Sequence, residues 1–291
     1  MKEGKFISGF KRVVGGWRED MQGRLVEYDG YRWQVGVEDG EYPLTADDLL
    51  YFYPLVLKSL GFEGKEVAIS LPAETYLKDR DYERTLKSKL REELGITAYV
   101  YPQGIVSLAY IEVKEPTVLV VDGGFNTINA CVVDTARELK VKWLKTYYNE
   151  FGIRDLLERY FREELLRKFP EVPNNFQILL RVFMNGYVDT GFKKQSVEEE
   201  KRISIKIWQD SLMRRIRGDI LRANKDFDAI LVVGGLSYYV TREGVEKPLY
   251  IPQDGEYANV RGLHNATSLD SVDFGFGHVK YLIDTEQERR R

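Results

Sequence analysis

The sequence contains very few of the residues on which many catalytic and metal sites depend. It has one cysteine and two histidines among its 291 residues, which excludes a disulfide framework and a Cys/His zinc site and disfavours a histidine-based triad. No apolar run approaches the roughly 20 residues that a membrane-spanning helix needs, and the N-terminus lacks the apolar core of a signal peptide. We therefore expect a cytoplasmic protein whose chemistry rests on carboxylates, amides, lysine, a bound metal or backbone N–H groups.

An excess of charge of one sign is also missing. The 43 lysines and arginines nearly balance 46 aspartates and glutamates, which leaves a net charge of −3. This balance argues against bare nucleic acid as the main partner. Hydrophobic residues make up 43% of the chain, enough for the core of one large domain or of two domains of about 150 residues each.

Apolar spacing divides the chain into alternating strands and helices, which is typical of an α/β layer. The first 45 residues are predicted to be β structure, with Asp29-Gly30 as a hairpin turn. Thr45 and Asp48 form a capping pattern that begins a helix, and Gly61 ends it. Further strands are expected over 67–71, 97–101, 117–124, 127–133 and 229–235, a strand–turn–strand over 271–283, and helices over 82–94, 103–113, 153–169 and 197–223.

Three of the predicted strands end in glycine turns, and these turns carry the candidate chemistry. Glycine lets the backbone approach a phosphate group and point N–H groups at it. A carboxylate at the end of a strand suits a metal–phosphate group, and a lysine suits a phosphate oxygen. The turns are Asp122-Gly123-Gly124-Phe125-Asn126-Thr127, Gly234-Gly235-Leu236 and Asp273-Phe274-Gly275-Phe276-Gly277-His278-Val279-Lys280.

Each turn also has a purely structural explanation. Asp-Gly is a common hairpin signal, and two glycines after a strand are a still weaker indication of a site. The chain has neither a G-x-x-x-x-G-K-[ST] loop nor a G-x-G-x-x-G helix start, which excludes P-loop and Rossmann sites. Because all three turns follow buried apolar strands, a shared nucleotide site is the hypothesis that we prefer.

The arrangement of these motifs resembles that of the actin / sugar kinase / Hsp70 ATPase superfamily, in which two domains clamp a nucleotide. The stretch 122–127 looks like the phosphate-2 hairpin of the family, and Gly234-Gly235 looks like its adenosine motif. The segment that begins at Gln103 is similar to the first connecting helix of actin, which begins with a water-positioning glutamine. Asn259-Val260-Arg261-Gly262-Leu263 is similar to the second connector of the ParM-like plasmid-segregation actins.

The order of the motifs departs from the family pattern. The phosphate-1 motif, D-x-G-x-x-x-x-K, opens the chain in the family, but here Asp273, Gly275 and Lys280 match it near the C-terminus. The resemblance therefore implies a two-domain actin-like (ribonuclease H-like) ATPase fold of the α/β class that is circularly permuted, a change that proteins tolerate when their chain ends lie close together. Alternatively, this hairpin is incidental and the protein does not hydrolyse nucleotide. The expected parts are domain I over 1–102 plus 270–291, domain II over 116–257, and connecting helices over 103–115 and 258–269.

The resemblance also implies roles for the site residues. ATP, with GTP as the alternative, is expected in the cleft between the domains together with Mg²⁺. Asp122 and Asp273 would hold the Mg²⁺, and Gln103 would orient the attacking water. Lys280 and the backbone N–H groups of the two phosphate turns would hold the β- and γ-phosphates. The remaining contacts are expected from Gly123, Gly124, Phe125, Asn126 and Thr127, from Phe274, Gly275, Phe276, Gly277 and His278, and, around base and ribose, from Gly234, Gly235 and Leu236.

Some of these roles have alternatives. Gln103 is also explained as a polar residue at a helix N-terminus, and Asn126 and Thr127 either bond phosphate or only cap their turn. His278 is expected to contribute its backbone rather than its ring. The charged helix over 197–223 is either a solvated face or places one lysine or glutamate beside the ribose.

The compact length and the second connector favour a ParM-like filament-forming ATPase for plasmid or DNA segregation. Such a protein assembles with itself head to tail, which is a heterologous contact that does not close. A DNA-bound adaptor protein is the expected further partner, with no direct contact to nucleic acid or membrane. A small-molecule kinase and a non-polymerising regulatory ATPase of the same superfamily are the alternative functions.

Overall fold

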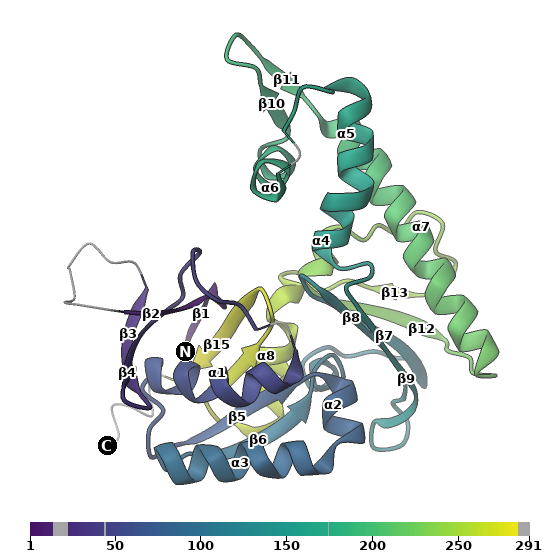
Figure 1. Cartoon of the computed structure of the whole chain (residues 1–291). Helices are drawn as coiled ribbons and strands as arrows, with labels where there is room; N and C mark the ends of the chain where they lie inside the picture. The colour runs from purple at the N-terminus through teal and green to yellow at the C-terminus, as the bar shows by residue number, and fades with distance from the viewer. Residues whose placement is uncertain (14–22, 44, 174, 285–291) are drawn as a thin grey trace. The chain divides into compact units, whose positions relative to one another are not determined.

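The computed structural model describes residues 1–13, 23–43, 45–173 and 175–284. The part of the predicted domain I that follows residue 284 therefore lies outside the described residues. The chain divides into two compact units (Figure 1): unit 1 comprises Met1–Lys114 and Pro252–Arg291, and unit 2 comprises Glu115–Ile251. None of the helices in the described ranges is long and apolar enough to cross a bilayer.

Unit 1 is built on a mixed five-stranded sheet whose strands come from both ends of the chain. The order is β1-β15-β14-β5-β6. Strands β14, β5 and β6 run parallel, whereas β15 is antiparallel to both β14 and β1. The C-terminal hairpin, yellow in Figure 1, thus lies between the first strand and the rest of the sheet. The bounds are Lys2–Ile7 for β1, Glu66–Leu71 for β5, Thr97–Pro102 for β6, Ser271–Phe274 for β14 and His278–Ile283 for β15.

The described part of unit 1 also contains a small antiparallel sheet, β2-β4-β3, and the helices α1, α2, α3 and α8. The hairpin that joins β3 to β4 has its turn at Asp29 and Gly30. Their φ angles of 51° and 72° suit a type I′ turn, as the sequence predicted. The predicted capping box of Thr45 and Asp48 is present, and Gly95 ends α3 in the left-handed conformation. The bounds are Phe10–Arg12 for β2, Arg24–Tyr28 for β3, Tyr31–Val35 for β4, Ala46–Ser59 for α1, Ala73–Lys78 for α2, Arg80–Leu94 for α3 and Ala258–Thr267 for α8.

Two helices differ from the sequence prediction. The prediction of a helix over 103–113 is wrong in length and in type, because only a 3₁₀ segment, η1 (Ile105–Ala109), forms there. Gly104, with φ of 75°, cannot continue an α-helix, and η1 is held by close packing: a Cβ on Gly262 of α8 would lie 2.1 Å from the Val106 carbonyl oxygen. The helix expected over 153–169 is present, but a π-helical stretch, η2 (Leu156–Phe161), interrupts it.

Alternation along β5 and β14 separates an apolar face from a polar one. Val67, Ile69 and Leu71 of β5 join the main core of unit 1, which also takes Val272 and Phe274 of β14. The residues between them face the other way, because side chains alternate along a strand. That second face carries Ala68, packed with Val106 and Leu263, and beyond it Ser70 and Asp273.

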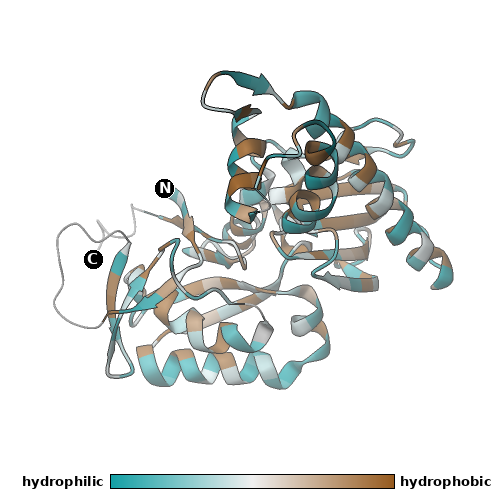
Figure 2. Ribbon diagram, turned by 45° about the horizontal axis from the view of Figure 1, so that its top comes forward, coloured by the Kyte–Doolittle hydropathy of each residue, from teal (hydrophilic) through white to brown (hydrophobic). Residues whose placement is uncertain are grey.

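Unit 2 contains a second mixed five-stranded sheet, with the order β13-β12-β7-β8-β9. Strands β7, β12 and β13 run parallel, and β7, β8 and β9 form an antiparallel meander. Hydrophobic residues run along its central strands (Figure 2), as expected for a sheet that is buried on both faces. The bounds are Thr117–Gly123 for β7, Thr127–Asp134 for β8, Lys140–Tyr148 for β9, Ala229–Gly234 for β12 and Leu249–Tyr250 for β13.

Helices and a short hairpin complete unit 2. The long helix α7 buries Trp208, Leu212, Ile216 and Ile220, four residues of the apolar seam that the sequence predicted. Helix α6 and the hairpin β10–β11 were not predicted, although the mostly apolar α6 has usable signals in its N-cap Asn175 and in the left-handed Gly186 that ends it. The bounds are Ile153–Asp155 for α4, Arg162–Lys168 for α5, Phe176–Asn185 for α6, Tyr187–Asp189 for β10, Lys194–Ser196 for β11, Glu198–Arg222 for α7 and Gly235–Tyr238 for the 3₁₀ segment η3.

The main sheets of the two units follow one strand pattern. In each, a central strand has an antiparallel neighbour followed by an edge strand on one side, and two parallel strands on the other. By this pattern β14 corresponds to β7, β15 to β8 and β1 to β9. Each central strand carries one candidate aspartate near its C-terminal end, Asp273 on β14 and Asp122 on β7.

Candidate functional site

The candidate site in unit 1 is centred on the buried carboxylate of Asp273, which is 3% exposed. Ser70 Oγ donates to Asp273 Oδ1 at 2.5 Å, and Gln103 Nε2 donates to the same oxygen at 3.1 Å. Ser70 and Asp273 meet because β5 and β14 run parallel, with Ser271 opposite Ala68. A buried carboxylate is costly without such partners, so the two donors fix Asp273 in one position.

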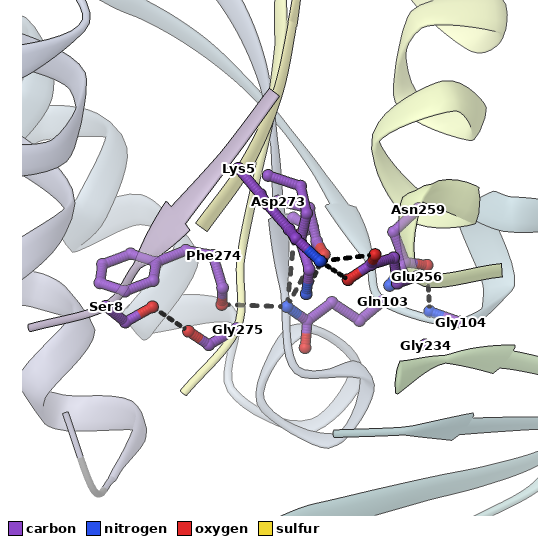
Figure 3. A network of polar contacts seen from close by, with 12 residues as sticks. Lys5, Ser8, Gln103, Gly104, Gly234, Glu256, Asn259, Asp273, Phe274 and Gly275 are labelled. Carbon is purple, nitrogen blue, oxygen red and sulfur yellow. Dashed lines mark hydrogen bonds and ion pairs between the residues drawn. The ribbon is translucent and has the colours of Figure 1, made fainter. Parts of the chain in front are cut away.

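Gln103 links β6, β5 and β14. Its backbone N–H donates to the Leu71 carbonyl at 2.8 Å, and its side-chain Nε2 also reaches the Phe274 carbonyl at 3.2 Å. Figure 3 shows the amide between Asp273 and Phe274, with its oxygen pointing away from both. The hydrogen bonds of the amide to the described residues use Nε2, so Oε1 is the atom that can accept a bond from a ligand or water.

A tight turn joins β14 to β15. Gly275 N donates to the His278 carbonyl at 3.1 Å, and Ser8 Oγ donates to the Gly275 carbonyl at 2.6 Å. A Cβ at Gly275 would lie 3.1 Å from the His278 carbonyl oxygen and 3.3 Å from Lys280 Nζ. The turn therefore leaves little room for a side chain at position 275, and His278 takes part in it through its backbone.

The electrostatics of the cluster involve one cation and one phenol. Lys280 Nζ lies 3.8 Å from Asp273 Oδ2. Tyr53, whose hydroxyl donates to the Ser70 carbonyl, is fully buried, and burial together with the nearby Asp273 charge raises its pKa. The phenol therefore stays neutral, and the Asp273 carboxylate is faced by Lys280.

Contacts from η1, α8 and β1 support this cluster. Asn259 Oδ1 accepts a hydrogen bond of 2.8 Å from Gly104 N, directly after Gln103. Lys5 of β1 pairs with Glu256 at 2.7 Å (Figure 3). The hydrogen bond between Asn259 and Gly104 positions the backbone from which the Gln103 side chain projects.

The candidate site in unit 2 lies at the ends of β7 and β12, which run parallel and bring Gly123 opposite Gly234. A Cβ at Gly123 would lie 1.7 Å from Leu236 Cδ1. Gly234 has φ of 76°, and a Cβ there would lie 2.4 Å from the Gly123 carbonyl oxygen and 2.5 Å from Asp122 Oδ1. Both glycines are therefore required by close approach, and Gly234 also by its backbone conformation.

The turn after β7 is fixed by its own backbone. Gly124 N donates to the Thr127 carbonyl at 2.8 Å, and Phe125 packs edge to face on Phe176 of α6. Asn126 Oδ1 is buried and accepts no hydrogen bond from the residues that the structure describes. Buried polar atoms normally have a partner, so this oxygen suits a donor that comes with a ligand, such as a bound water.

A metal held by protein groups alone needs several ligating side chains in one place. Among residues 1–13, 23–43, 45–173 and 175–284, no three His, Cys, Asp or Glu side chains gather into such a cluster. Mg²⁺ usually keeps several waters and takes one or two carboxylates together with phosphate oxygens. Asp273 and Asp122 fit that second mode, each as a single carboxylate.

The structure gathers the predicted residues into one group per unit. Unit 1 contains Gln103, Asp273, Phe274, Gly275, Phe276, Gly277, His278 and Lys280, and unit 2 contains Asp122, Gly123, Gly124, Phe125, Asn126, Thr127, Gly234, Gly235 and Leu236. The Phe274 and Leu236 side chains are core residues, so they can offer a ligand only their backbones. Ser70 was missed, although a single polar residue inside the apolar run from Val67 to Leu71 is a usable signal.

Sequence comparison and structure comparison give different results. The sequence matches no protein-family model and no curated protein. The structure is similar to that of the archaeal actin homolog Ta0583 in complex with ADP, with a TM-score of 0.65, 16% identity and coverage of 91% of this chain and 98% of that one. It is also similar to a 15-stranded ParM filament from Clostridium botulinum (TM-score 0.58, 13% identity, 88% and 89% covered) and to the Alp12 filament structure (TM-score 0.60, 14% identity, 89% and 88% covered).

These similarities cover almost the whole of each chain. They extend over both units, and the mixed α/β sheets agree with the class that the sequence predicted. The chain therefore has the two-domain actin-like fold.

Proposed function

We propose that this protein is an actin-like, Mg²⁺-dependent ATPase that assembles into filaments in response to its nucleotide. The turn after β14 in unit 1 and the turn after β7 in unit 2 each offer backbone N–H groups to the phosphates of the nucleotide. The cellular task that suits such a filament is the segregation of DNA through a DNA-bound adaptor protein. Filaments and an ADP complex among the similar structures support this proposal.

The observation that carries the proposal is the fixed carboxylate of Asp273. A carboxylate that is 3% exposed and bonded by Ser70 and Gln103 is set at the end of a strand, beside a glycine turn and Lys280. Hydrophobic packing alone would not select a charge at this position, because burying it costs free energy. A cation that neutralises a triphosphate explains both the charge and its position.

In this proposal, different residues of the chain have separate roles in hydrolysis. Gln103 Oε1 accepts a hydrogen bond from the attacking water and holds it in line, while Nε2 keeps the amide fixed on Asp273 and Phe274. Lys280 and the backbone N–H groups of 274–278 and 123–127 bind the phosphates. Asp273 and Asp122 would hold Mg²⁺ through water, and the metal would supply positive charge to the phosphates. Asn126 Oδ1, which has no hydrogen-bond partner among the described residues, suits one of those waters.

We further infer that the chain order is a circular permutation of the actin-like order. Two observations support this: the strand pattern of the main sheets is the same, and in unit 2 the meander β7-β8-β9 is continuous in the chain. In unit 1 the corresponding meander, β14-β15-β1, is divided between the two chain ends. Joining residue 284 to residue 2 would make it continuous, since Lys2 lies opposite Ile283.

The proposed function is tested by sedimentation with phosphate release measured in parallel. The purified chain is centrifuged with ATP and Mg²⁺, with a non-hydrolysable ATP analogue, with GTP and without nucleotide, and pellets are viewed by negative-stain microscopy. Filaments that depend on nucleotide, together with release of phosphate, are expected. Phosphate transfer to a small alcohol or acid without any pellet would instead identify a kinase, and hydrolysis without a pellet would identify a non-polymerising ATPase.

A further inference from the structure

Unit 2 exposes an aromatic side chain at the tip of a hairpin. Strands β10 and β11 pair antiparallel, with Asp189 opposite Lys194, and Gly191 has φ of 80° in the turn. Phe192 in this turn is 99% exposed. A single exposed apolar side chain needs no explanation by itself, but a phenylalanine at a hairpin tip has the shape to enter a groove on another molecule.

An apolar groove of about 740 Å³ lies elsewhere on the same unit, between the C-terminal part of α7 and the loop over 243–247. Its apolar lining includes Met213, Phe227 and Val245, which are only partly buried. Leu221 of α7 stands at its edge and is 65% exposed. The groove is therefore an apolar surface that is open to a partner.

Helix α7 separates the hairpin from the groove. Its first residue, Glu198, follows the hairpin by two positions, whereas Gly218 and Leu221 of the groove lie in its last two turns. At 1.5 Å per residue, the 25 residues of α7 span about 37 Å. Figure 1 shows the hairpin beside one end of α7 and away from the other end. A contact between the hairpin of one copy and the groove of the next would thus be heterologous and would repeat along one direction.

The charges on the two surfaces are complementary in one orientation. The helix wall of the groove carries Arg214 and Arg217, which form no ion pair with the described residues, whereas Asp210 on that wall and Glu243 on the loop both pair with Lys206. On the loop wall Lys247 pairs with Asp226, and Glu246 forms no ion pair with the described residues. On the hairpin, Asp189 belongs to β10, whereas Lys193 and Lys194 lie on the opposite side of the turn. A hairpin that enters with β10 towards α7 places its aspartate near the two arginines and its lysines near Glu246.

We propose that Phe192 of one subunit inserts into the α7 groove of a second copy of this chain, and that this contact joins successive subunits. The inference rests on the proposed filament function and specifies its longitudinal interface. Hairpin and groove lie on different surfaces of unit 2, so each subunit keeps one of each for its two neighbours.

The test uses one variant on each surface. Phe192→Asp places a charge on the hairpin tip, and Gly218→Trp fills the groove at a helical position where an added Cβ meets no atom closer than 3.7 Å. With Mg²⁺ and a non-hydrolysable ATP analogue, each variant is expected to raise the critical concentration for pelleting more than tenfold. Tyr99→Asp, an exposed aromatic on β6 of unit 1, is the matched control and should stay within twofold of wild type.

Mixing the two variants separates a lost contact from a lost fold. Phe192→Asp keeps an intact groove and Gly218→Trp keeps an intact hairpin, so an equimolar mixture should form a 1:1 dimer in sedimentation velocity, while each variant alone stays monomeric. Normal assembly of Phe192→Asp, or a mixture without dimers, would overturn the inference and leave the filament function standing. A wild-type chain that never pellets would remove the filament function, and the mixture would still decide whether hairpin and groove bind.

Discussion

Ser70 Oγ donates a hydrogen bond of 2.5 Å to Oδ1 of Asp273, across 203 positions of the chain. The two residues lie on the parallel strands β5 and β14, on the face opposite the main core of unit 1. Since Gln103 binds the same oxygen, one carboxylate connects three strand ends: β14, β5 and the exit of β6. This contact ties the C-terminal hairpin into the sheet formed by the N-terminal part of the chain.

Replacing Asp273 by asparagine should lower ATP hydrolysis at least about 100-fold while the fold persists. Asparagine keeps an oxygen that accepts from Ser70 and Gln103, but it removes the charge that the proposed metal–phosphate group requires. Phosphate release and circular dichroism are measured on the same preparation. Asp39→Asn, an exposed carboxylate paired with Lys11, serves as the control, and hydrolysis at the wild-type rate in Asp273→Asn would remove this residue from the site.

Gln103→Ala should lower kcat more than tenfold and leave nucleotide affinity within about twofold of wild type. An amide that orients water acts on the transition state rather than on the bound nucleotide. Steady-state phosphate release gives kcat, and titration with a fluorescent nucleotide gives Kd. Parallel losses in both quantities would show that Gln103 holds the structure of the cluster instead of orienting water.

Gly234→Ala should destabilise unit 2 by more than the backbone cost of a left-handed residue, which is about 1 kcal/mol. The added Cβ would meet the Gly123 carbonyl oxygen at 2.4 Å, in a place where neither strand end can move freely. Gly191→Ala is a matched control because φ there is also positive, at 80°, with no atom within 4 Å of an added Cβ. Urea unfolding followed by tryptophan fluorescence should give a clearly larger loss for Gly234→Ala, and equal losses would refute the crowding at β12.

Asp219 should make the stability of unit 2 depend on acid pH. Burial raises the pKa of this carboxyl, but bonds from Lys145, Tyr147 and Arg222 outweigh burial and lower it to about 2. A carboxyl whose pKa is lower in the folded than in the unfolded chain stabilises the fold fully above about pH 4, and this contribution is lost as the pH falls towards 2.

The corresponding variant is Asp219→Asn, which should reduce the free energy of unfolding by about 2 kcal/mol at pH 7. The difference from wild type should shrink steadily between pH 4 and pH 2, as measured by urea unfolding at each pH. The exposed Asp226, which pairs with Lys247, gives the control variant Asp226→Asn. A difference that stays constant down to pH 2 would contradict the assigned pKa direction.

A chain rearranged to begin at Asp270 should fold and keep its hydrolysis within about threefold of wild type. In this variant residue 284 is joined to residue 2 by a short linker, and the chain ends at Leu269. Lys2 lies opposite Ile283, so the linker has only a tight turn to span, and surface turns tolerate such changes. Loss of soluble protein with several linker lengths would argue against the permuted order that we infer.

The local pattern of the sequence was sufficient for many of the elements. The capping box at Thr45, the left-handed Gly95, the turn at Asp29-Gly30 and the apolar seam of α7 were predicted from spacing, because each depends on neighbouring residues. Predictions failed where distant packing decides the conformation. Segment η1 is short because α8, more than 150 positions later, packs against it through Gly262.

Local sequence was enough to locate the glycine turns and the strands that carry Asp122 and Asp273, since strand, glycine and carboxylate are adjacent in the chain. The surroundings of these turns depend on tertiary contacts. Ser70 became part of the site through the parallel pairing of β5 with β14 and the alternation of side chains along both strands. Which strands pair, and in which register, depends on contacts between residues far apart in the chain, and local propensity carries no information about them.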